Sequence, residues 1–105
     1  MESFFVKAFG GAPVVKIMDF LLESRGFDFT REDVVEESGV SRGTVDKMWP
    51  SLEGLGVVVE TRRIGNGVLY EVNKKSSVVR KLAELDRELT KAGTEKLFSR
   101  KAVSA

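Results

Sequence analysis

The sequence predicts a single, mostly helical α+β domain in which three helices precede a two-stranded β-hairpin and a fourth helix follows it. Three observations support this prediction. Apolar residues recur at helical spacing in the first half of the chain, two β-rich runs flank an Asn-Gly turn, and helical spacing returns after residue 76. At 105 residues the chain has room for one domain with one hydrophobic core.

The first helix is expected to begin at Pro13, because proline suits the first turn of a helix, and to end near Gly26. Residues 4–9 are apolar and precede Gly10-Gly11, which predicts a short edge strand or an arm packed on the core. The aromatic residues of the segment 27–29 are expected in the core. The helix is marked by apolar residues at helical spacing, namely Val14, Ile17, Met18, Leu21 and Leu22.

Two short helices follow, separated by a tight turn. Thr30 with Asp33 has the pattern of a helix start, and Gly39 is a suitable C-terminal stop. Ser41 can cap the next helix, whose buried stripe would be Val45, Met48, Trp49 and Leu52.

Gly43 and Pro50 weaken this third helix, since glycine lowers helix propensity and proline removes a backbone donor. We therefore expect a kink or an early stop near Trp49.

The hairpin and the last helix complete the chain. Residues 57–64 and 68–72 are β-rich and flank Gly65-Asn66-Gly67, which predicts a hairpin. Ser76 or Ser77 can then cap a helix that runs to about Lys91. We accordingly divide the chain into a domain at residues 1–75 with an N-terminal arm at 1–11, a C-terminal helix at 76–92, and a flexible tail at 93–105.

Composition argues against catalysis and against a membrane protein. The chain has no Cys and no His, so we expect neither an enzyme nor a cofactor or metal site. The acidic cluster of Glu32, Asp33, Glu36 and Glu37 could hold a metal or be an ordinary solvated face. No apolar run approaches the roughly 20 residues that span a bilayer, and no signal peptide is recognisable, so we expect a cytoplasmic protein.

The net charge of +1 hides an uneven distribution. Residues 19–37 contain seven acidic and two basic residues, a net charge of −5, whereas residues 62–101 contain eleven basic and five acidic residues, a net charge of +6. Because attraction to phosphate depends on the local face of a protein, a basic second half is compatible with a nucleic-acid partner.

The order of elements, a helix-turn-helix followed closely by a hairpin, lets one helix enter a DNA major groove while the hairpin reaches the neighbouring backbone. The stretch FTREDVVEESGVSRGTV at residues 29–45, with LEGLGVV at 52–58, resembles prokaryotic winged helix-turn-helix transcription regulators. The opening AFGGAPVVKI at 8–17 is similar to the start of many archaeal members. Over residues 8–73 this resemblance implies a winged helix-turn-helix fold that binds double-stranded DNA.

The resemblance also implies which residues contact DNA. In such regulators the exposed N-terminal positions of the helix after the turn read the groove, and the hairpin, or wing, contacts the backbone. Asp46 lies on the same exposed side and would repel phosphate unless it accepts from a cytosine amine. The charged candidates could instead be solvated charges or, on the hairpin, protection of an edge strand. The implied DNA-binding residues are Ser41, Arg42, Thr44 and Lys47 on the helix, with Arg62, Arg63 and Asn66 on the wing.

Leucine and valine residues on the last helix suggest a homodimer. They could pack on the domain or form a seam between two copies, and we expect the seam. A winged-helix protein interaction module in a larger complex is the alternative function. A small-molecule effector in a pocket between the last helix and the core is left open. The expected interface residues are Val78, Leu82, Leu85 and Leu89.

Overall fold

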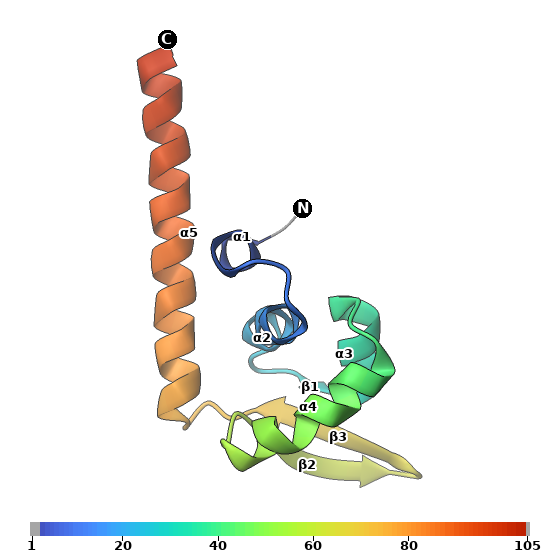
Figure 1. The fold of residues 1–105 in the computed structure, drawn as a ribbon. Coiled ribbons are helices and arrows are strands. Elements are labelled where there is room, and N and C mark those ends of the chain that lie inside the picture. Colours follow the sequence, from blue (N-terminus) through green and yellow to red (C-terminus); the bar gives the residue numbers. More distant parts are fainter. Residues whose placement is uncertain (1–2, 105) are drawn as a thin grey trace.

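The computed structural model describes the backbone of residues 3–104 and the side chains of residues 3–96. Figure 1 shows a helical body above a small sheet, with one long helix beside both. The strands form an antiparallel sheet in the order β1-β3-β2. The elements are α1 (Phe4–Phe9), α2 (Pro13–Glu23), β1 (Asp28–Phe29), α3 (Arg31–Ser38), α4 (Arg42–Gly54), β2 (Val58–Ile64), β3 (Gly67–Val72) and α5 (Ser77–Ser104).

This is the predicted α+β winged helix-turn-helix fold. Helices α3 and α4 form the helix-turn-helix, and strands β2 and β3 form the wing. Strand β1 adds a third strand that the sequence did not predict, pairing Phe29 with Tyr70. Its two residues are too few to leave a recognisable alternation of apolar and polar side chains.

Both ends of α3 and the start of α4 are fixed by local capping interactions that the sequence predicted. The hydroxyl of Thr30 accepts from the backbone N–H of Asp33 at 3.1 Å, and the Asp33 carboxylate accepts from the backbone N–H of Thr30 at 2.9 Å. Gly39 ends α3 with φ +75°, a conformation that glycine adopts without a steric penalty. Ser41 caps α4 two residues later. These caps set where the second helix starts and how it is oriented.

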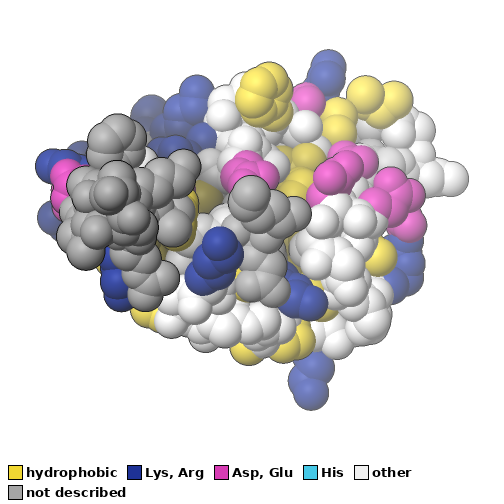
Figure 2. All heavy atoms as spheres, turned by 90° about the horizontal axis from the view of Figure 1, so that it is seen from above, with side chains coloured by type: hydrophobic (Ala, Val, Ile, Leu, Met, Phe, Trp, Pro, Cys, Tyr) yellow, Lys and Arg dark blue, Asp and Glu magenta, His cyan; other side chains and the backbone are white. Residues whose placement is uncertain are grey.

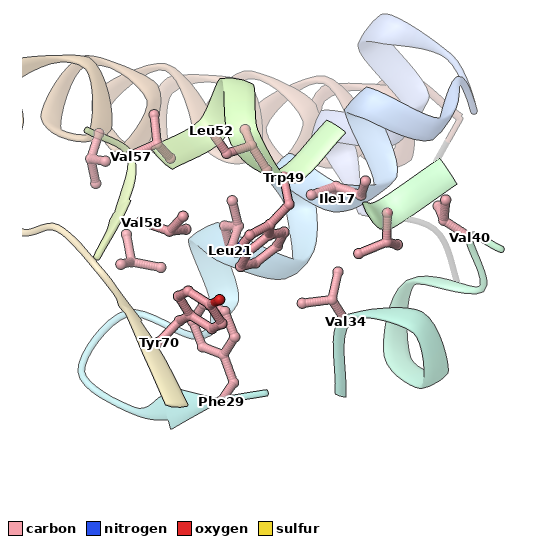
Figure 3. Packing of buried hydrophobic residues seen from close by; sticks show 13 residues of the cluster. Ile17, Leu21, Phe29, Val34, Val40, Trp49, Leu52, Val57, Val58 and Tyr70 are labelled. Atoms are coloured by element: carbon pink, nitrogen blue, oxygen red, sulfur yellow. The ribbon is translucent and has the colours of Figure 1, made fainter. Parts of the chain in front are cut away.

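The core is centred on Trp49, whose side chain is 1% exposed (Figure 3). Its ring lies 5.1 Å from the ring of Tyr70 and 6.3 Å from that of Phe29, both edge-to-face. Three elements, α4, β1 and β3, therefore meet at one side chain. Fully buried aliphatic residues such as Ile17 and Val34 complete this cluster.

The expected early stop of the third helix is wrong. Helix α4 continues through Pro50 to Gly54. Trp49 and Leu52 are both buried on the same side of the helix, and burial of these side chains outweighs the one backbone hydrogen bond that proline removes. Pro50 itself is exposed.

Two expectations for the N-terminal third are also corrected. Residues 4–9 form helix α1 and not an edge strand, because Ser3 caps them by accepting from the backbone N–H of Val6 at 3.1 Å. Phe5 and Val6 are buried, so this segment does pack on the body of the protein. Of the aromatic pair around Asp28, Phe29 is buried as expected, but Phe27 is 70% exposed.

The last helix is longer than the sequence suggested. Helix α5 runs to Ser104, so residues 93–104, expected as a tail, are helical. Gly93, the first residue of the expected tail, lies within α5, where the ring of Phe4 packs against it. A Cβ at Gly93 would lie 2.3 Å from Cε1 of Phe4, so the glycine permits close contact between α1 and α5. Residue 105 lies outside the described residues.

No helix in the described part of the chain has the length and apolar character needed to cross a membrane.

We predict that Trp49→Ala lowers the free energy of unfolding by about 3–5 kcal/mol, because it empties the junction of α4 with β1 and β3. Trp49→Phe should cost less than about 2 kcal/mol, since it keeps an aromatic ring and removes an indole N–H that has no hydrogen-bond partner. Urea denaturation followed by circular dichroism measures both. Equal losses in the two variants would show that packing at this site does not govern stability.

Candidate nucleic-acid interface

The predicted recognition residues lie at the N-terminal end of α4, next to the turn from α3. The hydroxyl of Ser41 accepts from the backbone N–H of Thr44 at 3.3 Å and donates to the hydroxyl of Thr44 at 2.9 Å. Both hydroxyls are thus engaged with each other as part of the helix cap. Ser41 remains exposed, and Thr44 is half-buried.

Arg42 and Lys47 are exposed on α4 but differ in their surroundings. Arg42 forms an ion pair with Glu32 of α3, and each of these side chains is 54% exposed. For Lys47, one turn after Thr44, no carboxylate lies within 4 Å among the side chains described for residues 3–96. Lys47 therefore carries an unbalanced positive charge on this helix.

A second ion pair joins the same two helices. The guanidinium of Arg31 lies 3.3 Å from the carboxylate of Asp46. Asp46 was expected to repel phosphate from the recognition surface, and the structure instead balances its charge with a cation from α3. Arg31 was not among the predicted site residues, because it lies in the first turn of α3 and not in α4 or the wing.

The wing carries the other two arginines, and each has a carboxylate partner. Arg62 reaches Asp28 of β1 at 3.1 Å, and Nε of Arg63 donates to Glu60 at 2.8 Å. That hydrogen bond and the charge of Glu60 raise the pKa of Arg63 above its ordinary value. Both arginine side chains are more than half exposed, so each can exchange its partner with a ligand from solvent.

The shape of the wing comes from its turn and from an irregularity in β2. Gly65 and Asn66 form a two-residue turn between β2 and β3, and Gly65 has φ +59°. The register shifts between Glu60 and Arg62, so Thr61 is an extra residue on this strand, as in a β-bulge. Asn66 is exposed at the tip of the wing.

The arginines at positions 31, 42, 62 and 63 share one property: each is paired with a carboxylate of the same chain. We use the name recognition face for the candidate residues of the helix-turn-helix and the wing taken together, which are Arg31, Arg42, Lys47, Arg62, Arg63 and Asn66. Sequence reasoning missed the carboxylates because two of the four pairs join residues ten and fifteen positions apart, and a third joins positions 28 and 62. Only the pair of Glu60 with Arg63 has a local spacing.

Acidic side chains gather on a different side of the helical body. Figure 2 shows several Asp and Glu side chains close together on the part of the helical body away from the end of α5. A hollow of about 610 Å³ between α2 and α3 is lined by carboxylates that include Asp19, Glu23, Asp33 and Glu37. Burial, together with Asp19 and Asp86, raises the pKa of Glu23 above its ordinary value. Among the described residues no group of Asp and Glu has an arrangement that could hold a metal ion.

At the level of sequence, the chain matches no protein-family model and no curated protein. Solved structures share its fold. ZitR of Lactococcus lactis has a TM-score of 0.60 at 18% identity, over 85% of this chain and 66% of that chain. A complex of ZitR with DNA gives a TM-score of 0.60 at 18% identity, over 81% of this chain and 60% of that chain.

Two further structures agree with this likeness. AdcR, the adhesin competence repressor of Streptococcus pyogenes, has a TM-score of 0.60 at 14% identity, over 86% of this chain and 66% of that chain. Ligand-free NadR has a TM-score of 0.61 at 19% identity, over 95% of this chain and 71% of that chain. At these identities the likeness establishes the fold. The chain spans less than two thirds of the length of ZitR, and the archaeal character suggested by residues 8–17 stays a prediction.

We predict that the carboxylates of the recognition face add little stability. Asp28→Asn, Glu32→Gln and Asp46→Asn should each change the free energy of unfolding by less than about 1 kcal/mol, because both partners in each pair are exposed to solvent. Val34→Ala, on the buried side of α3, is the control and should cost at least about 1.5 kcal/mol. If Glu32→Gln destabilises the protein as much as Val34→Ala does, the ion pair is a structural element of the helix-turn-helix.

Proposed function

We propose that this protein is a sequence-specific, double-stranded DNA-binding transcription regulator that acts as a homodimer in the cytoplasm. The observation that carries the proposal is the position of the recognition face. The exposed N-terminal turn of α4 and the wing are the two elements that a winged helix-turn-helix places in the major groove and on the adjacent backbone. The proposal involves no catalytic step, and the sequence contains neither His nor Cys.

The charges of the recognition face support a phosphate partner. Arg31, Arg42, Arg62 and Arg63 have exposed guanidinium groups, and planar guanidinium groups match phosphate oxygens in geometry. A duplex supplies phosphates in place of the carboxylates that hold these groups in the free protein. The acidic hollow between α2 and α3 is formed by other residues, so a duplex on the recognition face need not meet it.

Sequence readout is assigned to α4. Arg42 and Lys47 are the long polar side chains exposed near its start, and arginine can bind guanine with two hydrogen bonds. Ser41 and Thr44 are committed to the helix cap, and we propose that they contact phosphate while keeping that role. Asn66 is exposed at the wing tip, and we propose that it contacts the backbone or the minor groove.

The homodimer is proposed from the surface of α5. Val78 and Leu85 are 42% and 39% exposed, and they border a shallow, mostly apolar hollow with Leu82. Leu82 and Leu89 are half-buried against the cluster of Phe5, Leu22 and Ala83. The four residues expected to form one seam therefore divide: Val78 and Leu85 face outward, Leu89 packs inward, and Leu82 contributes to both sides. We assign the interface to the outward pair together with Leu82.

We predict that the protein binds duplex DNA with an affinity that falls as salt is raised. The triple variant Arg42→Ala, Lys47→Ala, Arg62→Ala should bind much more weakly, and each lost phosphate contact should make the slope of log affinity against log salt shallower by about one unit. Fluorescence anisotropy with mixed genomic duplexes at two salt concentrations measures this. Lys16→Ala, on α2 beside the acidic hollow, is the control and should bind as the wild type does.

The same measurement separates the alternatives. Salt-sensitive binding that the triple variant loses supports the regulator, and selection of duplexes from a random pool then tests sequence preference. A folded wild-type protein that binds no duplex at low salt contradicts the proposal. The alternative, a winged-helix protein interaction module, is then the leading hypothesis, and the next step is a search for its protein partner.

We predict that Leu85→Lys makes the protein monomeric at micromolar concentration, because it places a charge in the apolar part of the seam. Glu88→Lys, an exposed position on the same helix, is the control for adding a lysine to α5 and should leave the dimer intact. Sedimentation equilibrium measures the mass of each. A wild-type protein that is already monomeric contradicts the dimer and leaves the DNA-binding test unaffected.

A further inference from the structure

A second basic site lies at the start of α5, apart from the recognition face. A hollow of about 220 Å³ opens between the end of α2, the connection from β3 to α5, and the first turns of α5. Val79 and Ala83, both buried, contribute its apolar surface. No residue of α4 or β2 lines it. The remaining lining residues are Arg25, Lys74, Arg80, Glu84 and Arg87.

The backbone brings these cations together. Nε of Arg25 donates to the carbonyl of Leu22 at 2.9 Å, which holds the guanidinium beside the end of α2. Gly26, next in the chain, has φ +92°, and a Cβ at this position would lie 3.9 Å from Nζ of Lys74. The turn after α2 therefore places Arg25 close to the strand-to-helix connection. Arg80 and Arg87 lie seven residues apart and project from the same side of α5.

The charges around this hollow are not balanced. Within the side chains described for residues 3–96, no carboxylate lies within 4 Å of the charged groups of Arg25, Lys74, Arg80 or Arg87. Glu84, the one acidic lining residue, lies 3.7 Å from Lys81 instead. On the recognition face every arginine has a carboxylate partner. Four like charges around one hollow repel one another, so this arrangement favours an anion.

We infer that this hollow is a binding site for a small phosphate-bearing anion. Three guanidinium groups and one ammonium group surround the hollow, and their N–H groups can donate hydrogen bonds to phosphate oxygens. The volume is below the 300–1,000 Å³ or so of pockets for drug-sized ligands, which suits one or two phosphate groups better than a whole nucleotide. A bound anion would link α2 of the winged domain to α5, the helix assigned to the dimer. A regulatory role for the anion therefore rests on the proposed function.

Pyrophosphate is the probe for this inference. We expect saturable binding to the full chain by isothermal titration calorimetry and a rise in melting temperature relative to sodium chloride at the same ionic strength. Arg80→Gln with Arg87→Gln should weaken binding at least tenfold. Lys91→Gln, an exposed position farther along α5, is the matched control and should bind as the wild type does. If the double variant does not fold, Lys74→Gln, in the exposed connection before α5, tests the same site.

Duplex DNA is the other source of phosphate, and a second arm of the experiment identifies it. Anisotropy with a duplex should give the same affinity for the double variant and the wild type if the hollow takes a small anion. Loss of duplex binding in the double variant, with no binding of pyrophosphate to the wild type, overturns the inference and assigns these arginines to the DNA backbone. Equal binding of pyrophosphate by the wild type, the double variant and Lys91→Gln also overturns it. Binding of pyrophosphate without any binding of DNA supports the site and contradicts the proposed function.

Discussion

The burial of Trp49 between α4 and the sheet is the interaction on which the rest of the structure depends. Its ring packs edge-to-face against Phe29 of β1 and Tyr70 of β3, so one side chain fixes α4 relative to the base of the wing. The same burial keeps α4 helical through Pro50, where local propensity alone favours a stop. The spacing between the start of α4 and the wing is thus set from the core and not by the exposed residues that would contact DNA.

Local signals predicted much of this fold. Helix caps and tight turns depend only on residues that are close together in the chain, so they can be recognised from the sequence alone. Examples are the caps at Thr30 and Ser41, the helix end at Gly39 and the turn at residues 65–67. Strand β1 and the contact of Phe4 with Gly93 depend on segments far apart in the chain, and neither has a periodicity that could reveal it. The C-terminal helix was predicted from its apolar spacing, but its length was not.

The positions of the candidate residues in the fold were predictable, but their electrostatic surroundings were not. Arg42, Lys47 and Arg62 are exposed at the start of α4 and on the wing, where the order of elements placed them. Their surroundings depend on tertiary contacts, because Glu32 comes from α3 and Asp28 from β1. In the sequence, both carboxylates belong to the acidic segment at residues 19–37, which looked separate from the basic second half of the chain. The structure shows that the acidic half contributes directly to the recognition face.

This arrangement has a consequence for the proposed DNA binding. An exposed ion pair contributes about 0–1 kcal/mol to stability. Breaking the pair so that the arginine can bind a phosphate therefore costs little free energy. The pair nevertheless holds a long side chain in one region, which reduces the conformational entropy that binding would otherwise remove, roughly 0.5–1.5 kcal/mol for each side chain. The carboxylate of each pair also reduces the attraction between its arginine and a single phosphate. Paired arginines therefore favour a duplex that engages several of them together over one that meets a single charge.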